Sequence, residues 1–152
     1  MRANRLMGLA VVASLASGCA SSVPDPSPAQ ERATQVALAM VGKPYRFGGH
    51  SPATGFDCSG LVHYSFGRAG ARVARSTEQL RRSSTRVPSG DLRRGDLLFF
   101  DQEGKDSSHV AIYIGSDRFV HAPSSGKLVH VADFKSRYWR THFNEARRLE
   151  LD

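Results

Sequence analysis

Cysteine is scarce in this sequence of 152 residues, which holds only Cys19 and Cys58. Two cysteines cannot form the framework of several disulfides that small secreted domains use. They also do not form a C-x-x-C pair, and a thiol redox protein usually needs that pair or a second resolving cysteine. The scarcity therefore excludes a disulfide scaffold and disfavours a redox role.

Long hydrophobic runs are also missing. The longest apolar stretch covers residues 6–15, whereas a helix that crosses a bilayer needs about 20 apolar residues. Arg2 and Arg5 precede this stretch and the small residues "ASGC" follow it, which is the order of a secretory signal peptide. We therefore predict that residues 1–18 are a signal peptide; the alternative is a short membrane anchor that stays attached.

The predicted signal ends at a cysteine. The residues before Cys19 resemble the lipobox of bacterial lipoproteins, although Ala16 occupies the position where leucine is usual and Leu15 lies one place earlier. The resemblance implies that Cys19 is lipidated and becomes the new N-terminus, and several acyl chains anchor a protein stably in a membrane. Ala20 stands where an aspartate would signal retention in the inner membrane, so we expect the outer membrane, facing the periplasm. Residues 19–29 are then the lipidated N-terminus and a flexible Pro/Ser-rich tether.

Acidic residues are outnumbered by basic ones. The formal net charge is +7, and the loss of Arg2 and Arg5 with the signal, which has no acidic residue, would leave +5. A basic surface suits an anionic polymer or a lipid headgroup. The basic residues are scattered and form neither a basic helix nor a zinc-finger spacing, so we expect no nucleic-acid partner. The length and the absence of internal repeats predict one domain, which we place at residues 30–152 and expect to be a monomer.

Hydrophobic periodicity changes halfway along the chain. Apolar side chains recur at helical spacing in residues 28–42 and again from Cys58 to Gly70, and "STEQL" at residues 76–80 has the pattern of a capping box before a short helix. Later segments are typical of strands: "GDLLFFD", "HVAIYIG", "DRFVHA", "KLVHVADF" and "FNEARRLEL". Helices followed by an antiparallel meander predict an α+β domain.

Cys58 lies where the N-terminus of a helix would activate it. Asp57 is a good N-cap residue, so Cys58 belongs in the first helical turn, near free backbone N–H groups and the positive end of the helix dipole. Both features stabilise a thiolate, which is the nucleophilic form. With Cys19 lipidated, Cys58 has no disulfide partner. It is then either a buried, inert residue or a reactive one, and the local sequence leaves both open.

A nucleophilic cysteine also needs a base. The chain has six histidines: His50, His63, His109, His121, His130 and His142. His109 opens one predicted strand and His121 ends the next, so pairing about residue 115 would bring both to the same rim. His130 is a weaker candidate, His50 lies in a loop from which it would reach substrate, and the other two are typical structural histidines. A zinc site made of Cys58, His109 and His121 is the competing interpretation, but the close spacing of zinc motifs is absent, so we expect no metal and no other cofactor.

Four segments together resemble a known family: "GKPYRFGG", "GFDCSGLVHYSF", "RRGDLLFF" and "HVAIYIGSDRFVHAPSSGKLV". The family is that of the NlpC-type cell-wall peptidases, papain-like cysteine endopeptidases of bacteria, and the likeness runs from about residue 30 to about residue 150. It implies a circularly permuted papain-like fold, in which a helix that carries the cysteine packs on an antiparallel sheet that carries the histidines. The usual proline before "GD" is Arg94 here, at a position that shapes a turn.

The resemblance also implies roles for individual residues. The catalytic positions of the family correspond to Cys58 as nucleophile, His109 as base, His121 as the polar residue that orients the base, and Tyr45 as a support for the oxyanion. The substrate-binding positions correspond to Asp57, Ser59, Arg75, Ser76 and Gln79. The implied reaction is hydrolysis of stem-peptide or cross-link bonds in peptidoglycan, next to D-amino acids or diaminopimelate, without a cofactor.

Two other functions remain open at this point. A non-catalytic wall-binding lipoprotein would predict the loss of at least one of Cys58, His109 and His121, and all three are present. A papain-like amidase or acyltransferase would use the same triad on a lipid or a small peptide. Only its substrate would separate that enzyme from a peptidoglycan endopeptidase, and the sequence does not specify which bond is cleaved.

Overall fold

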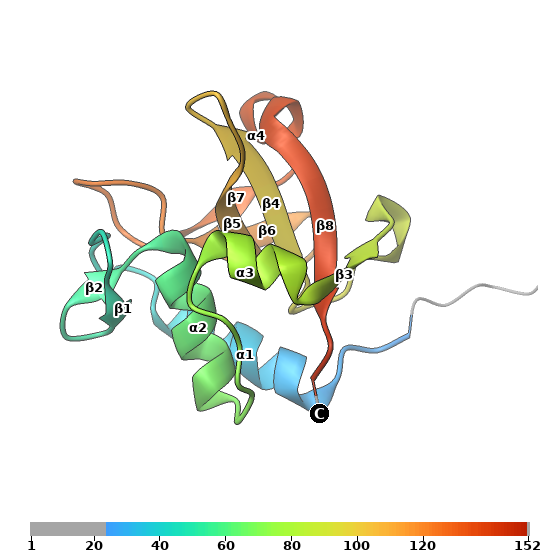
Figure 1. Cartoon of the computed structure of the whole chain (residues 1–152), viewed down its shortest axis with the longest axis horizontal. Coiled ribbons are helices and arrows are strands. Elements are labelled where there is room, and N and C mark those ends of the chain that lie inside the picture. Colours follow the sequence, from blue (N-terminus) through green and yellow to red (C-terminus); the bar gives the residue numbers. More distant parts are fainter. Residues whose placement is uncertain (1–23, 152) are drawn as a thin grey trace, which may run out of the picture.

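The computed structural model describes residues 24–151 and has an α+β fold, which confirms the predicted fold class. Helices α1 (Pro28–Ala39), α2 (Cys58–Arg68) and α3 (Thr77–Arg82) come first, and most of the sheet follows them. Figure 1 shows these three helices grouped beside the sheet, with α4 (Arg137–His142) at one end of it. The predicted signal peptide and Cys19 lie outside the described residues. None of the helices within residues 24–151 combines the length and the apolar character that crossing a bilayer requires.

The main sheet has six strands in the order β3-β8-β4-β5-β6-β7, and all neighbouring strands are antiparallel. Their bounds are Ser84–Val87 for β3, Leu97–Gln102 for β4, Lys105–Gly115 for β5, Arg118–His121 for β6, His130–Asp133 for β7 and Phe143–Leu149 for β8. The five strands that the sequence predicts are present. Sequence periodicity does not reveal α4, β3, the one-turn helix η1 (Ser89–Asp91) or the small hairpin of β1 (His50–Ser51) and β2 (Gly55–Phe56), because each is too short to show a period.

Both faces of the main sheet are covered. On one face, Val110 belongs to the core that includes Phe66 of α2. On the other face, Phe100 and Phe119 pack against Trp139 of α4. Because side chains alternate between the faces of a strand, a strand buried on both faces reads as a continuous apolar run. This explains the uninterrupted "LLFF" of β4.

A tight hairpin joins β5 to β6. Its two turn residues, Ser116 and Asp117, have φ values of 51° and 55°. Two consecutive residues with positive φ are the mark of a type I′ turn, whose twist matches that of the flanking strands. The predicted turn between the two strands is therefore confirmed, and it brings the end of β6 alongside β5.

The register of this hairpin differs from the prediction. Tyr113 pairs with Phe119, so the pairing is centred on residue 116 rather than on residue 115. His109 and His121 are therefore two residues out of register instead of directly opposite. Their rings still meet, because long side chains on the same face of neighbouring strands can reach a diagonal partner.

Side-chain caps set the starts of α1 and α3. Ser27 accepts a hydrogen bond from the Gln30 backbone N–H and Gln30 accepts one from the Ser27 backbone N–H, which is a complete capping box. α1 therefore begins at Pro28, inside residues 19–29, for which the sequence predicts the lipidated N-terminus and tether. At α3, Ser76 accepts from the Gln79 backbone N–H, but within the described residues no bond returns from the Gln79 side chain. The box predicted there is half formed.

A cluster of charges holds α3 against the sheet. Glu145 of β8 has a side chain that is only 2% exposed, and it pairs with Arg81 of α3, Arg86 of β3 and Arg147 of β8. Burial would raise the pKa of Glu145, but the hydrogen bonds from Arg81 and Arg147 outweigh burial and hold that pKa below its ordinary value. The carboxylate therefore stays charged at neutral pH. This fixes α3, whose first residue is Thr77.

Candidate active site

α2 places Cys58 at its first position, as the sequence predicts. Asp57 is the N-cap, and its Oδ1 accepts a hydrogen bond of 2.6 Å from the Gly60 N–H. The cysteine therefore lies at the positive end of the helix dipole. Gly60 has no space for a side chain, because a Cβ there would lie 2.0 Å from the carbonyl oxygen of Gly49. The loop that contains Gly49 thus packs directly on the first turn of the cysteine helix.

A hydrogen-bond network fixes the Asp57 carboxylate. Arg75 pairs with it through two bonds of 2.9 Å, from Nη1 to Oδ1 and from Nη2 to Oδ2. The Gly48 N–H donates to Oδ2 at 2.9 Å, and Arg75 also reaches Ser59 Oγ at 2.9 Å. The structure therefore brings together Asp57, Ser59 and Arg75, three predicted substrate-binding residues. Their polar groups bond mostly to one another and position the start of α2; contact with substrate stays a prediction.

The Cys58 sulfur lies between α3 and β5. Thr77 Oγ1 is 3.7 Å from it. Burial raises the pKa of the Cys58 thiol, and the nearby Thr77 hydroxyl and the backbone of Val110, the residue after His109, offset the effect only in part. Within residues 24–151, no hydrogen bond joins the sulfur to His109 directly. The resting site therefore holds a neutral thiol. In enzymes, the hydrogen bond between a nucleophile and its base is often long or poorly aligned without substrate and tightens when substrate binds.

His109 and His121 are buried and hydrogen-bonded to each other. His109 Nε2 lies 2.8 Å from His121 Nδ1. Burial lowers the pKa of His109 to about 4. Burial, with added repulsion from His109, His130 and Lys127, lowers the pKa of His121 to about 2. Both rings are therefore neutral at pH 7, and the predicted base lies in contact with its predicted orienting residue.

Sequence reasoning undervalues one residue of this site and misses two. His130 is the weaker candidate by sequence, yet its Nε2 lies 3.2 Å from His121 Nε2. Trp139 stacks on His109 with ring centroids 5.9 Å apart and meets His121 edge-on at 4.9 Å. Thr77, the partner of the sulfur, has no signal except its place after a predicted helix cap. Trp139 has only the signal that it is the single tryptophan of the chain.

Tyr45 lies in the loop that precedes β1. Burial raises the pKa of Tyr45, and the charges of Cys58 in its thiolate form, of Asp57 and of Glu103 raise it further. The side chain is therefore a neutral phenol at pH 7, whose hydroxyl can donate a hydrogen bond. This is the property that the support of an oxyanion needs, and the role itself stays a prediction.

The remaining candidates lie outside the hydrogen-bond networks of the cysteine and the histidine pair. Ser76 and Gln79 are exposed and are bonded to each other at the start of α3. His50 is exposed, and its Nδ1 lies 3.2 Å from a carbonyl oxygen of its own loop. His63 and His142 each contact a backbone carbonyl oxygen nearby, as structural histidines do. A role for Ser76, Gln79 or His50 in binding substrate stays a prediction.

A cavity of about 510 Å³ opens beside the histidines. His121, His130 and Trp139 line it, together with the cation of Lys127 and the carboxylate of Glu103. Its walls thus offer an aromatic surface and charges of both signs. Such a lining suits a peptide that carries both carboxylate and amino groups.

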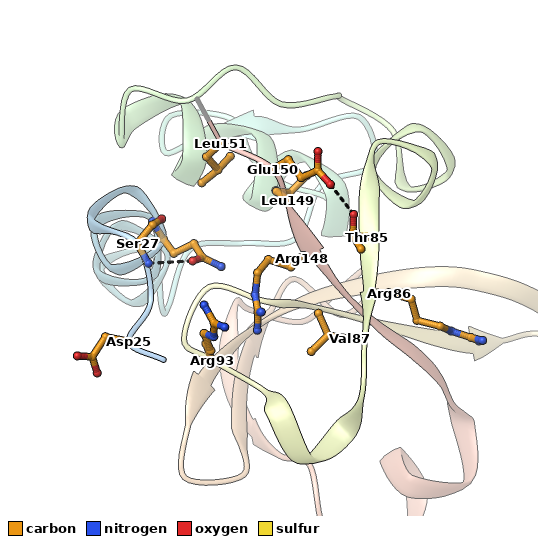
Figure 2. A pocket seen from close by; sticks show the side chains of 11 residues that line it. Asp25, Ser27, Thr85, Arg86, Val87, Arg93, Arg148, Leu149, Glu150 and Leu151 are labelled. Carbon is orange, nitrogen blue, oxygen red and sulfur yellow. Dashed lines mark hydrogen bonds between the residues drawn. The ribbon is translucent and has the colours of Figure 1, made fainter. Parts of the chain in front are cut away.

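A second cavity, of about 440 Å³, lies between the start of α1 and the β3–β8 edge of the sheet. Figure 2 shows the side chains that line it, with Ser27 at the start of α1 and Thr85 bonded to Glu150. The Ser27 backbone N–H donates to Gln30, which also lines the cavity. Arg148, which also lines it, pairs with the buried Asp96 at 2.7 Å. None of the predicted catalytic residues lines this cavity.

The zinc interpretation requires three ligands that converge. Within the part of the chain that the structure describes, no three His, Cys, Asp or Glu side chains are arranged to hold a metal ion. The facing nitrogens of His109 and His121 share a hydrogen bond, and the Cys58 sulfur contacts Thr77. The arrangement favours proton transfer over metal ligation.

A cysteine at the start of a helix and a buried histidine pair on an antiparallel sheet together define a cysteine-peptidase type of domain. The sequence model of the NlpC/P60 family matches residues 42–148, and the chain belongs to that family. The resemblance noted from the sequence motifs is thereby confirmed.

Relatives of this chain include two Escherichia coli proteins. Murein DD-endopeptidase MepH is 36% identical over 127 residues, which cover 78% of this chain and 47% of MepH. Murein DD-endopeptidase MepS/Murein LD-carboxypeptidase is 40% identical over 106 residues, which cover 69% of this chain and 55% of that protein. The chain thus spans about half the length of these curated relatives.

Solved structures show the same fold. A Staphylococcus aureus protein described as similar to lipoprotein, NLP/P60 family, superposes with a TM-score of 0.74 at 34% identity, over 85% of this chain and 44% of that one. The peptidoglycan hydrolase RipB of Mycobacterium tuberculosis superposes with a TM-score of 0.67 at 29% identity, over 80% of this chain and 64% of that one. The helices-then-sheet architecture is therefore that of the NlpC/P60 structures.

Proposed function

We propose that this protein is a peptidoglycan endopeptidase in which Cys58 is the nucleophile and His109 is the base. One observation carries the proposal: in an NlpC/P60 chain, α2 begins at Cys58 and packs on β5, and His109 of β5 is hydrogen-bonded to His121 of β6. MepH and MepS are named as murein DD-endopeptidases, which supports a cell-wall peptide as the substrate. The bond would be a stem-peptide or cross-link bond next to a D-amino acid or diaminopimelate.

In the proposed reaction, the sulfur of Cys58 attacks the carbonyl carbon of the peptide while its proton passes to His109. The C–N bond then breaks, His109 gives the proton to the leaving amine, and a thioester remains. A water molecule, deprotonated by His109, hydrolyses the thioester and restores the thiol. Because the resting thiol and imidazole are both neutral, proton transfer accompanies attack instead of preceding it.

Two donors are proposed for the oxyanion that forms during attack. One is the backbone N–H of Cys58, since the first N–H groups of a helix have no partner within the helix. The other is the hydroxyl of Tyr45, which the raised pKa keeps protonated. Electrostatic stabilisation by hydrogen-bond donors that are fixed before the reaction starts is usually the largest single contribution to an enzyme's rate enhancement.

The charge of the protein supports an acidic substrate. The formal net charge is +7, or +5 once Arg2 and Arg5 are lost with residues 1–18, and Lys127 lines the cavity beside the histidines. Peptidoglycan stems carry free carboxylates, which a cation in this cavity would attract. This attraction is compatible with a stem bond and with a cross-link bond.

The test is digestion of purified peptidoglycan by the full chain, followed by mass spectrometry of the released muropeptides. We expect new fragments in which a single peptide bond has been hydrolysed, and their masses identify the bond. An alkylated sample of the same protein is the control and should release nothing. An unchanged muropeptide profile on several wall types would contradict the proposal, and release of amine from a small peptide or lipid amide would then favour an amidase or acyltransferase.

We also propose that residues 1–18 direct export and that lipid on Cys19 anchors the enzyme in the outer membrane, facing the periplasm. The order of charged, apolar and small residues before Cys19 supports export and lipidation. A solved relative described as similar to lipoprotein supports this type of anchor in the family. The placement in the outer membrane rests on Ala20, which replaces the retention aspartate.

Replacement of Cys19 tests the anchor. Without the thiol no lipid can be attached, so Cys19→Ala should move the protein from the membrane fraction to the soluble fraction of fractionated cells. Cys58→Ala is the matched control, because it removes the other thiol of the chain and should leave the protein in the membrane fraction. A Cys19→Ala protein that stays with the membrane would show that the anchor is the uncleaved apolar segment.

A further inference from the structure

A third histidine extends the buried pair to a backbone carbonyl. His130 lies directly opposite His121 in the β6–β7 ladder, and their Nε2 atoms are 3.2 Å apart. His130 Nδ1 lies 2.9 Å from the carbonyl oxygen of Leu128. At the other end, His121 Nδ1 lies 2.8 Å from His109 Nε2. Three imidazole rings and one carbonyl thus form a single unbranched chain of hydrogen bonds.

The carbonyl at the end of this chain determines where each proton lies. A carbonyl oxygen can only accept, so His130 Nδ1 carries a proton, and Nε2 of the neutral ring must accept. His121 Nε2 then donates to His130, and His121 Nδ1 accepts from His109. Burial lowers the pKa values of His109 and His121, so both rings stay neutral and the order holds.

We propose that His130 is a positioning residue that, together with the Leu128 carbonyl, holds His109 in the tautomer able to accept the Cys58 proton. In this tautomer Nε2 of His109 carries the proton and Nδ1 is free to accept. His109 Nδ1 has no hydrogen-bond partner within residues 24–151, so nothing competes for it there. The inference rests on the proposed role of His109 as base. His130 acts only through His121 and does not touch the reacting atoms.

The same chain makes the base sensitive to protonation of His130. An added proton on His130 Nε2 turns that atom into a donor, and it then faces the donor on His121 Nε2. The hydrogen bonds re-form only if His121 and His109 each change to the other neutral tautomer. His109 Nδ1 would then carry a proton and could not take one from Cys58. Protonation of one ring at the cavity wall therefore removes the base.

Several charged or titratable groups face His130 in the 510 Å³ cavity and bias this protonation. They are His121 of β6, Lys127 of the preceding loop, Glu103 of the β4–β5 turn and Tyr138 of α4. The cation of Lys127 opposes an added proton, whereas the carboxylate of Glu103 favours it. Because an added proton on His130 removes the base, the acid limb of the activity profile should depend on His130 and not only on His109, whose pKa burial lowers to about 4.

Two substitutions separate this role from simple packing. Lysine can only donate, so His130→Lys should force the wrong tautomer on His109 and lower kcat/KM on a soluble muropeptide by about 100-fold, a typical share for a general base. Glutamine can accept from His121 and donate to Leu128 without titrating. His130→Gln should keep kcat/KM within about tenfold of the wild type, again within the scale of general-base effects, and move the acid limb of the pH profile towards pH 4. His142→Lys, the same change at a histidine outside the chain of bonds, is the matched control.

A readout that needs no substrate makes the test independent of the proposed function. In the full chain labelled with nitrogen-15, the His109 Nδ1 resonance should have the shift of an unprotonated ring nitrogen. It should move to the protonated range in His130→Lys and stay in place in His130→Gln and His142→Lys. An unmoved resonance in His130→Lys, or equal kcat/KM for the Lys and Gln variants, would overturn the inference. If the wild type cleaves no peptidoglycan, the proposed function fails, and the resonance still decides the tautomer.

Discussion

Cys58→Ala is expected to slow muropeptide release by about 10⁴-fold or more, because it removes the group that forms the covalent intermediate. The substitution should leave the fold intact. Among residues 24–151 the side chain makes one side-chain hydrogen bond, at 3.7 Å to Thr77, and the cap of α2 comes from Asp57. Circular dichroism and the thermal midpoint should therefore match those of the wild type. Release rates are measured by chromatography of the soluble muropeptides over time.

A second substitution shows whether the thiol and the imidazole act as a unit. His109→Ala should lower the rate to a similar level, since the neutral thiol of Cys58 then has no acceptor for its proton. Residues that act together give strongly non-additive losses. The double variant should thus be no slower than Cys58→Ala alone. If the rate loss of the double variant equalled the product of the two single losses, His109 would serve some step other than activation of this cysteine.

The position of the cysteine can be predicted from sequence because it depends on local chemistry. Asp57 is a cap residue, and an N-cap fixes which residue opens the helix. The pairing of β5 with β6 is also local, since a two-residue turn joins them. The predicted contact between His109 and His121 is present although the predicted strand register is wrong, because both rings lie on the same face of the sheet in either register.

The rest of the site depends on contacts between distant segments, which leave no periodic signal. Thr77 reaches the sulfur because α3 is held by two distant contacts: Leu80 packs into the core, and Arg81 pairs with Glu145 near the end of the chain. Trp139 covers the histidines from α4, a helix too short to be read from periodicity.

Arg94 shows the same limit of sequence reasoning. The family resemblance marks it as a departure from a turn proline. In the structure its guanidinium bonds to Glu31 of α1 and to the Ile114 carbonyl, so it ties the first helix to the end of β5. The sequence alone reveals a lost proline and gives no sign of the contact that replaces it.

Gly60→Ala is expected to lower the free energy of unfolding by about 3 kcal/mol, the upper part of the usual range for overpacking. This change in the free energy of unfolding has the opposite sign to the usual effect, because alanine inside a helix is normally about 1 kcal/mol more stabilising than glycine. At Gly60 a Cβ would lie 2.0 Å from the Gly49 oxygen and 2.8 Å from Asp57 Oδ1, which Arg75 holds in place. The helix and the loop must therefore move apart.

That movement should reach the chemistry as well as the stability. The loop of residues 45–49 carries Tyr45, and the helix start carries Cys58, so their separation would pull the oxyanion donors apart. A displacement of about 1 Å can cost about 100-fold in rate. We therefore expect Gly60→Ala to release muropeptides at least about tenfold more slowly, even at temperatures where it is fully folded.

Gly67→Ala, on the same helix, is the matched control. A Cβ at Gly67 would meet nothing within 4 Å, so this substitution should raise the free energy of unfolding by up to about 1 kcal/mol and leave the release rate unchanged. Urea unfolding followed by circular dichroism measures the first quantity, and muropeptide chromatography measures the second. If Gly60→Ala proved as stable and as active as Gly67→Ala, the loop that contains Gly49 could move away from α2 without lowering the free energy of unfolding. The position of Cys58 would then be set by the packing of α2 on β5 and by the contact with Thr77 of α3, and not by the tight contact with Gly49.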